Sequence, residues 1–188
     1  MSPRRTAVEA QETRETVLDA AIGVARRSGG RFTVDAVARE AGVSKGAVLH
    51  HFRSKEALAA GMLERELDVF EALLDRKLAE EPAGEPGRWL RAYVKASFEA
   101  GPGDAGVNEA LMAALATDPG LLEPFEGRFS AWKRLSEEDG LGAARAAVVR
   151  HAVDGLVTAE IFGLGAPEGA EREALMRELI GLTLGPSR

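Results

Sequence analysis

Cysteine is absent from this chain of 188 residues. Its absence excludes a disulfide framework, a thiolate nucleophile and a thiolate metal site. Long apolar runs are absent as well. No run of apolar residues approaches the ~18 residues that a membrane-spanning helix needs. Residues 1–11 hold no apolar stretch of the kind found in a secretory signal. We therefore expect a cytoplasmic protein that has no membrane partner.

The motifs of common enzyme classes are missing too. The chain has no H-E-x-x-H metal motif, no glycine-rich phosphate loop and no G-x-S-x-G nucleophile elbow. Of the three histidines, two are adjacent at positions 50 and 51, which leaves His151 by itself. We expect no catalytic activity, no metal and no cofactor.

The net charge of −6 is unevenly distributed. Residues 1–60 hold ten Lys and Arg against seven Asp and Glu, which gives +3. The other 128 residues hold 14 basic and 23 acidic side chains, which gives −9. A positive head on an acidic body fits a protein that touches phosphate with one end only, although a solvated basic surface gives the same pattern.

Apolar residues recur with helical spacing nearly everywhere, and no alternation of strand length is present. The sequence therefore predicts an all-α protein of about nine helices. We expect them from about Val8 to Ser28, after Thr33 through Ala41, after Ser44, from Lys55 to about Glu80, over Pro86–Glu99 and Val107–Thr117, after Asp118-Pro119, after Gly140 to about Leu164, and over Glu168–Leu184. Thr33, Ser44 and Ser54 are the expected capping residues.

Residues 33–52 predict a helix-turn-helix. Gly42 can take the positive φ that reverses the chain between the two short helices. Val43 and Val48 contribute to a small core, which should pack on the first long helix through Ile22 and Ala25. Such a pair is too small to fold alone, so it is expected to be part of a larger N-terminal domain.

The second of these helices presents residues suited to DNA on its outward side. They are Lys45, Gly46, Ala47, Leu49 and His50. A helix that enters a major groove reads bases with its N-terminal residues. Backbone N–H groups near Thr33, Ser44 and Lys55 lie at helix starts, where anions such as phosphate are favoured. An ordinary helical hairpin has similar spacing but does not need this exposed content.

The run from Thr33 to Phe52, with its continuation His51-Phe52-Arg53-Ser54-Lys55-Glu56-Ala57-Leu58, resembles the DNA-binding domain of the TetR family of repressors. The resemblance covers about residues 10–60. It implies that Thr33, Lys45, Ala47, His50, His51 and Lys55 contact DNA. One position departs from the family, which usually has a phosphate-binding tyrosine where this chain has Leu49. A leucine there can instead meet a thymine methyl group.

The resemblance also implies a DNA-binding domain over residues 1–54 and a helical regulatory and dimerisation domain over residues 55–188. Small residues recur every four positions near the end of the chain, which permits close helix contact. The expected dimer contacts are Gly155, Ala159, Phe162, Gly163, Leu175, Leu179 and Leu182. Packing within one chain is the alternative for each of them. A homodimer is nevertheless expected, because contact with a single half-site is too weak for an operator.

The regulatory domain also contains candidates for binding a small-molecule effector. They are Trp89, Tyr93, Met112, Phe125, Phe129, Trp132, His151 and Asp154. The large apolar side chains suit the lining of a ligand cavity, and His151, Asp154 and Thr158 share one helix face. Plain core packing, and a solvated helix surface for His151, are the alternatives.

These patterns predict a ligand-responsive DNA-binding regulator, a repressor released from double-stranded operator DNA by a small apolar or amphipathic molecule. The long helix that begins at Ser54-Lys55 joins the two domains, so we expect ligand to tilt it and change the spacing of the two recognition helices. Two other classes stay open: an enzyme, and a helical interaction module whose DNA-binding head is vestigial. Leu49 and the acidic total favour the second of these.

Overall fold

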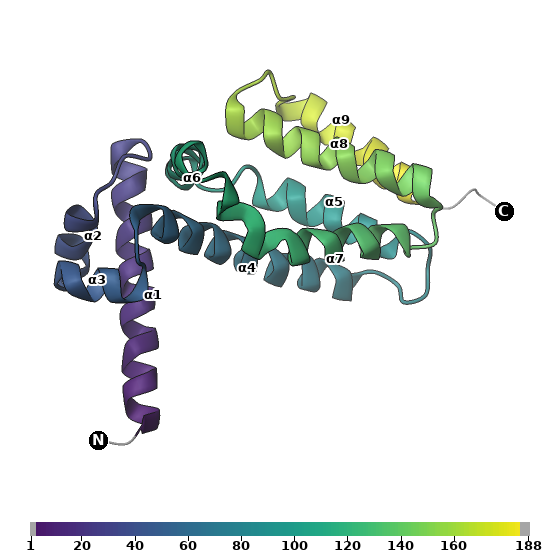
Figure 1. Ribbon diagram of the computed structural model, residues 1–188. Coiled ribbons are helices and arrows are strands. Elements are labelled where there is room, and N and C mark those ends of the chain that lie inside the picture. The colour runs from purple at the N-terminus through teal and green to yellow at the C-terminus, as the bar shows by residue number, and fades with distance from the viewer. Residues whose placement is uncertain (1–2, 185–188) are drawn as a thin grey trace. The chain divides into compact units, whose positions relative to one another are not determined.

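The computed structural model describes residues 3–184 of the chain, and the side chains of residues 8–184. Its helices are α1 (Pro3–Ser28), α2 (Val34–Ala41), α3 (Lys45–His51), α4 (Lys55–Glu80), α5 (Arg88–Ala100), α6 (Ala105–Thr117), the 3-10 helix η1 (Pro119–Phe125), α7 (Glu126–Glu137), α8 (Ala143–Phe162) and α9 (Gly169–Thr183) (Figure 1). No strand occurs among the described residues, and the predicted all-α fold is confirmed. None of the described helices is both long enough and apolar enough to span a bilayer.

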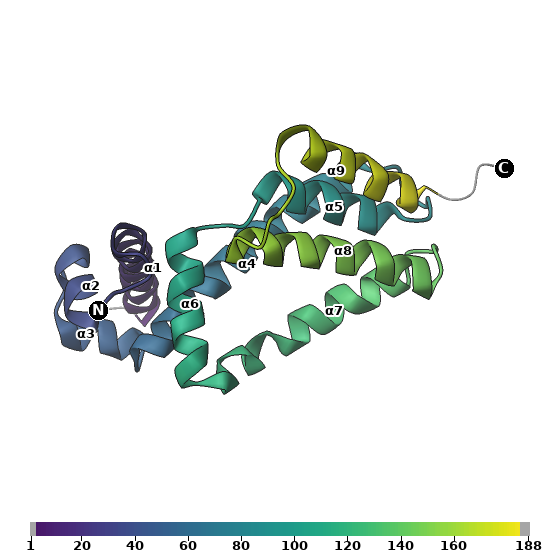
Figure 2. The same cartoon turned by 90° about the horizontal axis from the view of Figure 1, so that it is seen from above.

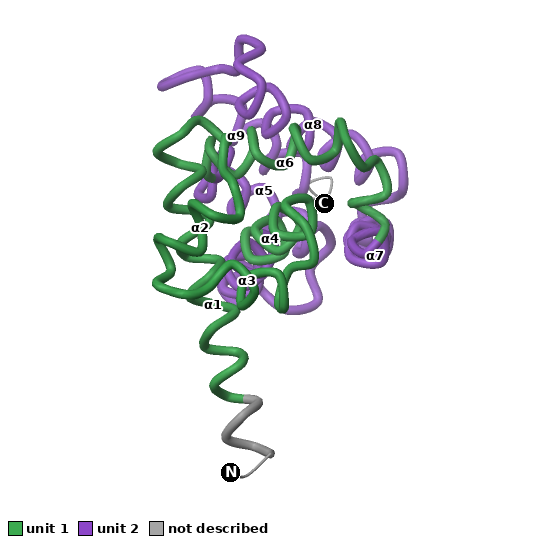
Figure 3. Tube along the Cα trace, turned by 60° about the vertical axis from the view of Figure 1, so that its left-hand side comes forward, with its two compact units in different colours: residues 1–66, 104–123 green, residues 67–103, 124–188 purple. Residues whose placement is uncertain are grey.

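The chain divides into two compact units, which Figure 3 shows in different colours. Unit 1 comprises Met1–Glu66 and Asp104–Glu123, and unit 2 comprises Leu67–Gly103 and Pro124–Arg188. Residues 1–2 and 185–188 of the two predicted domains lie outside the described residues. Unit 1 extends past the boundary predicted between residues 54 and 55. That boundary concerns functional domains and stays a prediction.

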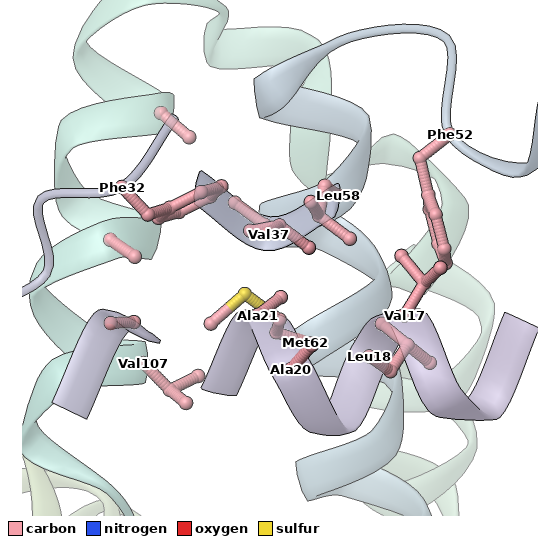
Figure 4. Close-up of a cluster of buried hydrophobic side chains, with 14 of the residues drawn as sticks. Val17, Leu18, Ala20, Ala21, Phe32, Val37, Phe52, Leu58, Met62 and Val107 are labelled. Carbon is pink, nitrogen blue, oxygen red and sulfur yellow. The ribbon is translucent and has the colours of Figure 1, made fainter. Parts of the chain in front are cut away.

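Unit 1 is built around an apolar core to which α1, α2, α3, α4 and α6 all contribute (Figure 4). The large side chains of this core that are at most 4% exposed are Val17, Leu18, Phe32, Val37, Val48, Phe52, Leu58, Met62 and Val107. Ile22 and Val43 pack against this core and Ala25 is part of it, as the sequence predicts. Burying a side chain of this size stabilises a fold by about 1.5–3 kcal/mol, so the helix-turn-helix is held by its packing on α1.

Helix α6 joins unit 1 from far along the sequence, and it lies beside α1 (Figures 1 and 2). A Cβ atom at Gly106 would lie 2.6 Å from the backbone nitrogen of Arg26. Only glycine permits so close an approach. Val107, Ala110 and Ala114 are buried along the same face of α6. The close contact therefore fixes α6 to the element on which the helix-turn-helix packs.

Unit 2 is arranged around α5, which packs against α8 and α9 and more lightly against α7. Leu90 and Val94 of α5 and Val149 and Val153 of α8 are fully buried. Helices α7 and α8 are close together where residues 138–142 join them, and they diverge away from that end (Figure 2). The first half of α7 and the second half of α8 are thus spread apart within unit 2.

A buried ion pair links three helices of unit 2. Arg91 is 4% exposed, and its Nε donates to Oε2 of Glu81 at 2.9 Å. Its Nη1 donates to the carbonyl oxygen of Thr183 at 3.0 Å. Lys95 donates to the other carboxylate oxygen of Glu81. The end of α4, the body of α5 and the end of α9 are therefore linked through Arg91.

The prediction that an α-helix begins after Asp118-Pro119 is wrong for the first part of that segment. Residues Pro119–Phe125 form the 3-10 helix η1, and the α-helix α7 begins only at Glu126. Pro124 lies inside η1. Proline has no N–H to donate and clashes with the preceding turn of an α-helix, so an α-helix does not run through this segment.

Candidate functional site

The turn between α2 and α3 is closed by Gly42, which has a left-handed φ of 68°. Its N–H donates to the carbonyl oxygens of Ala38 and Arg39, which ends α2. Thr33 Oγ1 accepts the N–H of Ala36 at 3.1 Å, and Ser44 Oγ accepts the N–H of Ala47 at 3.1 Å. The predicted positive φ and the predicted caps at Thr33 and Ser44 are therefore present in the structure, and the third predicted cap, Ser54, accepts the N–H of Ala57 at 3.1 Å.

Helix α3 has one buried anchor and an accessible remainder. Val48 is 0% exposed and belongs to the core of unit 1. The predicted DNA-contacting residues Lys45, Gly46 and His50 are exposed, and Leu49 is 37% exposed. The remaining predicted contacts are also accessible: Thr33 and Ser44 are exposed, while Ala47, His51 and Lys55 are half-buried. The side of α3 opposite Val48 is therefore free of other parts of unit 1.

Charged and aromatic neighbours hold the cations of this surface in place. Lys45 Nζ lies 2.9 Å from Oδ2 of Asp35, in an ion pair whose two side chains are 56% and 63% exposed. Lys55 Nζ lies 5.0 Å from the centre of the Phe32 ring, within the range of a cation–π interaction. Lys55 is thereby brought close to the start of α2.

His50 and His51 pack edge to face, with ring centres 5.3 Å apart. Burial, together with the neighbouring His50 and Arg14, lowers the pKa of His51 below its ordinary value of 6.5. An uncharged imidazole at neutral pH offers one donor and one acceptor nitrogen. The accessible surface around α3 therefore combines cations, capped helix starts and a ring that can accept as well as donate a hydrogen bond.

Unit 2 contains an apolar cavity of about 400 Å³, which we call the ligand cavity. It lies where α7 and α8 diverge, and α4 and α5 also contribute to its wall. Its lining is Leu67, Phe70, Tyr93, Ser97, Gly101, Phe129, Trp132, Asp154, Val157, Thr158 and Ile161. This volume falls in the range of cavities that bind small molecules in proteins, about 300–1,000 Å³.

Polar groups gather at one part of this lining. The hydroxyl of Tyr93 donates to Oδ1 of Asp154 at 2.6 Å, and Arg150 Nη1 donates to Oδ2 at 3.2 Å. Burial and the Asp154 carboxylate raise the pKa of the Tyr93 hydroxyl. Tyr93 therefore remains a hydrogen-bond donor, and the Asp154 carboxyl group lies in a largely apolar wall.

The structure brings four of the eight predicted ligand residues together, namely Tyr93, Phe129, Trp132 and Asp154. The other four do not line the cavity. Trp89 is buried and stacks on Tyr93 with ring centres 5.2 Å apart, and Phe125 is 8% exposed at the end of η1. Met112 is exposed on α6 of unit 1, and His151 points to solvent with its side chain 67% exposed.

Several lining residues are not among those predicted. Val157 and Ile161 share one face of α8 with Asp154 and Thr158, at spacings of three, four and seven residues. Leu67 and Phe70 come from α4, and Ser97 and Gly101 come from α5 and its end. The helical spacing from Asp154 is the one signal in the sequence that points to part of this set.

Comparison with known proteins decides the family. Residues 87–184 match the profile described as "Tetracyclin repressor-like, C-terminal domain", and residues 17–62 match "Bacterial regulatory proteins, tetR family". A crystal structure of a transcriptional regulator from Rhodococcus sp. Rha1 is 31% identical, with a TM-score of 0.66, over 90% of this chain and 95% of that one. The chain belongs to the TetR family.

Two curated relatives match the N-terminal part of this TetR-family chain. The HTH-type transcriptional regulator SrpR of Pseudomonas putida is 46% identical over 65 residues, which are 34% of this chain and 30% of SrpR. The uncharacterized HTH-type transcriptional regulator TtgW, also of Pseudomonas putida, is 46% identical over 65 residues, or 48% of TtgW. The chain thus spans less than half the length of these relatives. These proteins are transcriptional regulators, and the predicted DNA-binding regulator is confirmed at the level of the family.

All but one of the predicted dimer residues of this TetR-family protein are accessible to solvent, and the exception is Leu179. On α8 and at its end, Gly155, Phe162 and Gly163 are exposed and Ala159 is half-buried. On α9, Leu182 is 40% exposed, Leu175 is half-buried and Leu179 is 3% exposed in the core of unit 2. The α8 residues lie on a face other than that of Asp154, Val157 and Ile161, so one helix has separate cavity and solvent faces.

Proposed function

We propose that this TetR-family protein is a ligand-responsive repressor, which binds operator DNA as a homodimer and is released by a small apolar or amphipathic molecule. The observation that carries this proposal is the ligand cavity in unit 2. It combines a mainly apolar lining with a small group of polar side chains, which is the usual composition of a small-molecule site.

On the DNA side, the proposal assigns Lys45, Gly46, Ala47, Leu49 and His50 to the major groove. The phosphate backbone at the edges of the groove is contacted by Thr33, Ser44, His51 and Lys55. The accessible side of α3 supports this assignment, since those residues have solvent access while Val48 is buried. Helix starts at Thr33 and Ser44 direct backbone N–H groups outward, where phosphate oxygens are favoured.

A homodimer presents two copies of α3 to two half-sites. The exposed apolar residues on α8 and α9 support a self-complementary contact. Phe162 is 53% exposed and Leu182 is 40% exposed, and Gly155 and Ala159 leave room for a close helix approach. In this proposal residues 1–54 read DNA, and residues 55–188 bind the effector and the second copy.

The path of the chain provides a route from ligand to DNA. The chain leaves the cavity lining at Gly101, forms α6 in unit 1, and returns to the lining at Phe129. Helix α4 likewise begins in unit 1 and contributes Leu67 and Phe70 to the lining. A ligand that binds one arrangement of α4 and α6 more tightly than another shifts the population between them, and both helices reach the core that supports the helix-turn-helix.

A reporter gene placed behind the operator, in a host that produces the protein, tests this function. The reporter should be silent with the wild-type protein and active after addition of some member of a library of apolar and amphipathic compounds. Thr158→Trp fills the cavity from an accessible position and should keep the reporter silent with the same compound. Lys133→Trp, on the exposed part of α7, is the matched control and should respond normally. A reporter that no compound activates, or that Thr158→Trp leaves fully responsive, contradicts the proposal.

A further inference from the structure

The charge of the ligand cavity is concentrated at one residue. Among the lining residues, all of which lie in the described part of the chain, Asp154 is the one that carries a formal charge. The other polar lining groups are the hydroxyls of Tyr93, Ser97 and Thr158. A molecule inside the cavity therefore meets a single negative charge in an otherwise uncharged wall.

The partners of Asp154 leave part of its acceptor capacity unused. Oδ1 accepts the Tyr93 hydroxyl at 2.6 Å, and Oδ2 faces Arg150 Nη1 at 3.2 Å and His151 Nδ1 at 3.8 Å. An ionised carboxylate offers about four acceptor positions. Arg150 and His151 are not among the lining residues, so the Arg150 guanidinium does not add a positive charge to the cavity wall.

Aromatic rings form another part of the cavity wall. Phe70 contacts Tyr93 and Trp132 with ring centres 5.9 Å and 5.4 Å away. Phe129 meets Trp132 edge to face at 5.6 Å. The faces of aromatic rings are negative and attract cations, most strongly where water is excluded.

We infer that the effector is an apolar molecule with a single cationic nitrogen, which lies among the aromatic rings and is directed toward Asp154. The inference rests on the proposed function and specifies its ligand. An alkylammonium has the required chemistry, because its chain occupies the space between Leu67, Val157 and Ile161 while its head meets the carboxylate. A carboxylate whose alkyl chain is as long as that of the alkylammonium is repelled by Asp154.

Tryptophan fluorescence measures binding without DNA. The chain has two tryptophans, and Trp89→Phe leaves Trp132, which lines the cavity, as the reporter. Three probes of one chain length are titrated: octyltrimethylammonium, octanol and octanoate. We expect octyltrimethylammonium to bind about tenfold more tightly than octanol, as about 1.4 kcal/mol of cation–π and charge attraction requires, and octanoate to bind most weakly.

Two substitutions separate the roles of the charged groups. Asp154→Asn keeps an acceptor for Tyr93 and should weaken octyltrimethylammonium binding about tenfold with little change for octanol. Asp75→Asn, on the exposed side of α4, removes the same charge elsewhere and should change neither. Arg150→Gln removes the competing cation and should tighten octyltrimethylammonium binding.

The outcomes distinguish this inference from the proposed function. If octanol or octanoate changes Trp132 fluorescence at concentrations as low as the ammonium probe, the cavity binds ligands but the inference about charge is overturned. Loss of octanoate binding in Arg150→Gln would identify an anionic effector. If none of the three probes alters Trp132 fluorescence, both the inference and the ligand cavity of the proposed function are overturned.

Discussion

Two glycines only four residues apart in the helix-turn-helix should respond to alanine in opposite ways. At Gly42 the backbone is left-handed, with φ 68°, and an added Cβ meets no atom within 4 Å. The penalty of Gly42→Ala is therefore conformational, because an L side chain disfavours this region by about 1–2 kcal/mol. The substitution should lower the free energy of unfolding of unit 1 by about 1 kcal/mol, since alanine also restricts the unfolded chain.

Gly46 provides the matched control. It lies in α3, and an added Cβ meets only Ser44 Oγ at 3.7 Å, which is an ordinary contact. Gly46 is the second residue of α3 and its φ is not positive, so alanine stabilises the fold by about 0.4–1 kcal/mol because it restricts the unfolded chain. Gly46→Ala should therefore stabilise unit 1, and the two variants should differ by about 1.4–2 kcal/mol although each adds one methyl group.

Amide hydrogen exchange in α2 and α3 measures this difference for unit 1 alone, which matters because a two-unit chain need not unfold in one step. Urea unfolding followed by circular dichroism gives a second measure, in which a stability change shifts the midpoint. Gly42→Ala exchange as slow as that of the wild-type protein would refute the left-handed turn. Faster exchange in Gly46→Ala would refute the helical, unobstructed position of that residue.

Three further perturbations test the charged groups. Lys55→Ala should weaken binding to all DNA sequences and lower the slope of log affinity against log salt by ~0.9, the loss of one phosphate contact; an unchanged slope in an anisotropy titration would remove Lys55 from the interface. Asp35→Asn should tighten operator binding, measured in the same titration, because Lys45 loses its partner at 2.9 Å and becomes free for phosphate; weaker binding would mean that Asp35 positions Lys45 for contact. Burial alone would raise the pKa of the Glu81 carboxyl, but hydrogen bonds from Lys95 and Arg91 lower it from 4.5, so its stabilising effect is lost as pH falls below that value. Urea unfolding of Glu81→Gln should show a loss of about 3 kcal/mol at neutral pH and a flatter decline in acid, and an unchanged acid profile would exclude this role.

The helix-turn-helix could be predicted from the sequence because its signals are local. Thr33 and Ser44 cap the helices that follow them, and Gly42 takes the positive φ that the turn needs. Each of these interactions joins residues no more than four positions apart. The effect of Pro124, which lies inside η1, is local as well, because proline disrupts the α-helix within the turn that contains it.

The membership of α6 in unit 1 could not be predicted in this way. It depends on Gly106 meeting the backbone at Arg26, which is a contact between distant parts of the chain with no periodic signal. Only part of the lining of the ligand cavity could be predicted, because that lining also depends on contacts between distant parts of the chain. Trp89 and Trp132 are equally aromatic, yet only Trp132 lines the cavity, because that depends on the helix face that each occupies.

Selection from a random library of DNA duplexes, followed by sequencing, tests the central claim most directly. That claim is that the exposed side of α3 reads a DNA groove. The account predicts convergence on an inverted repeat, with half-site centres about one helical turn, ~34–36 Å, or a wider multiple apart. The double variant Lys45→Ala, His50→Ala should lose that convergence, whereas Lys133→Ala on α7 should keep it. A wild-type pool that does not converge, or a double variant that selects the same repeat, would contradict the account.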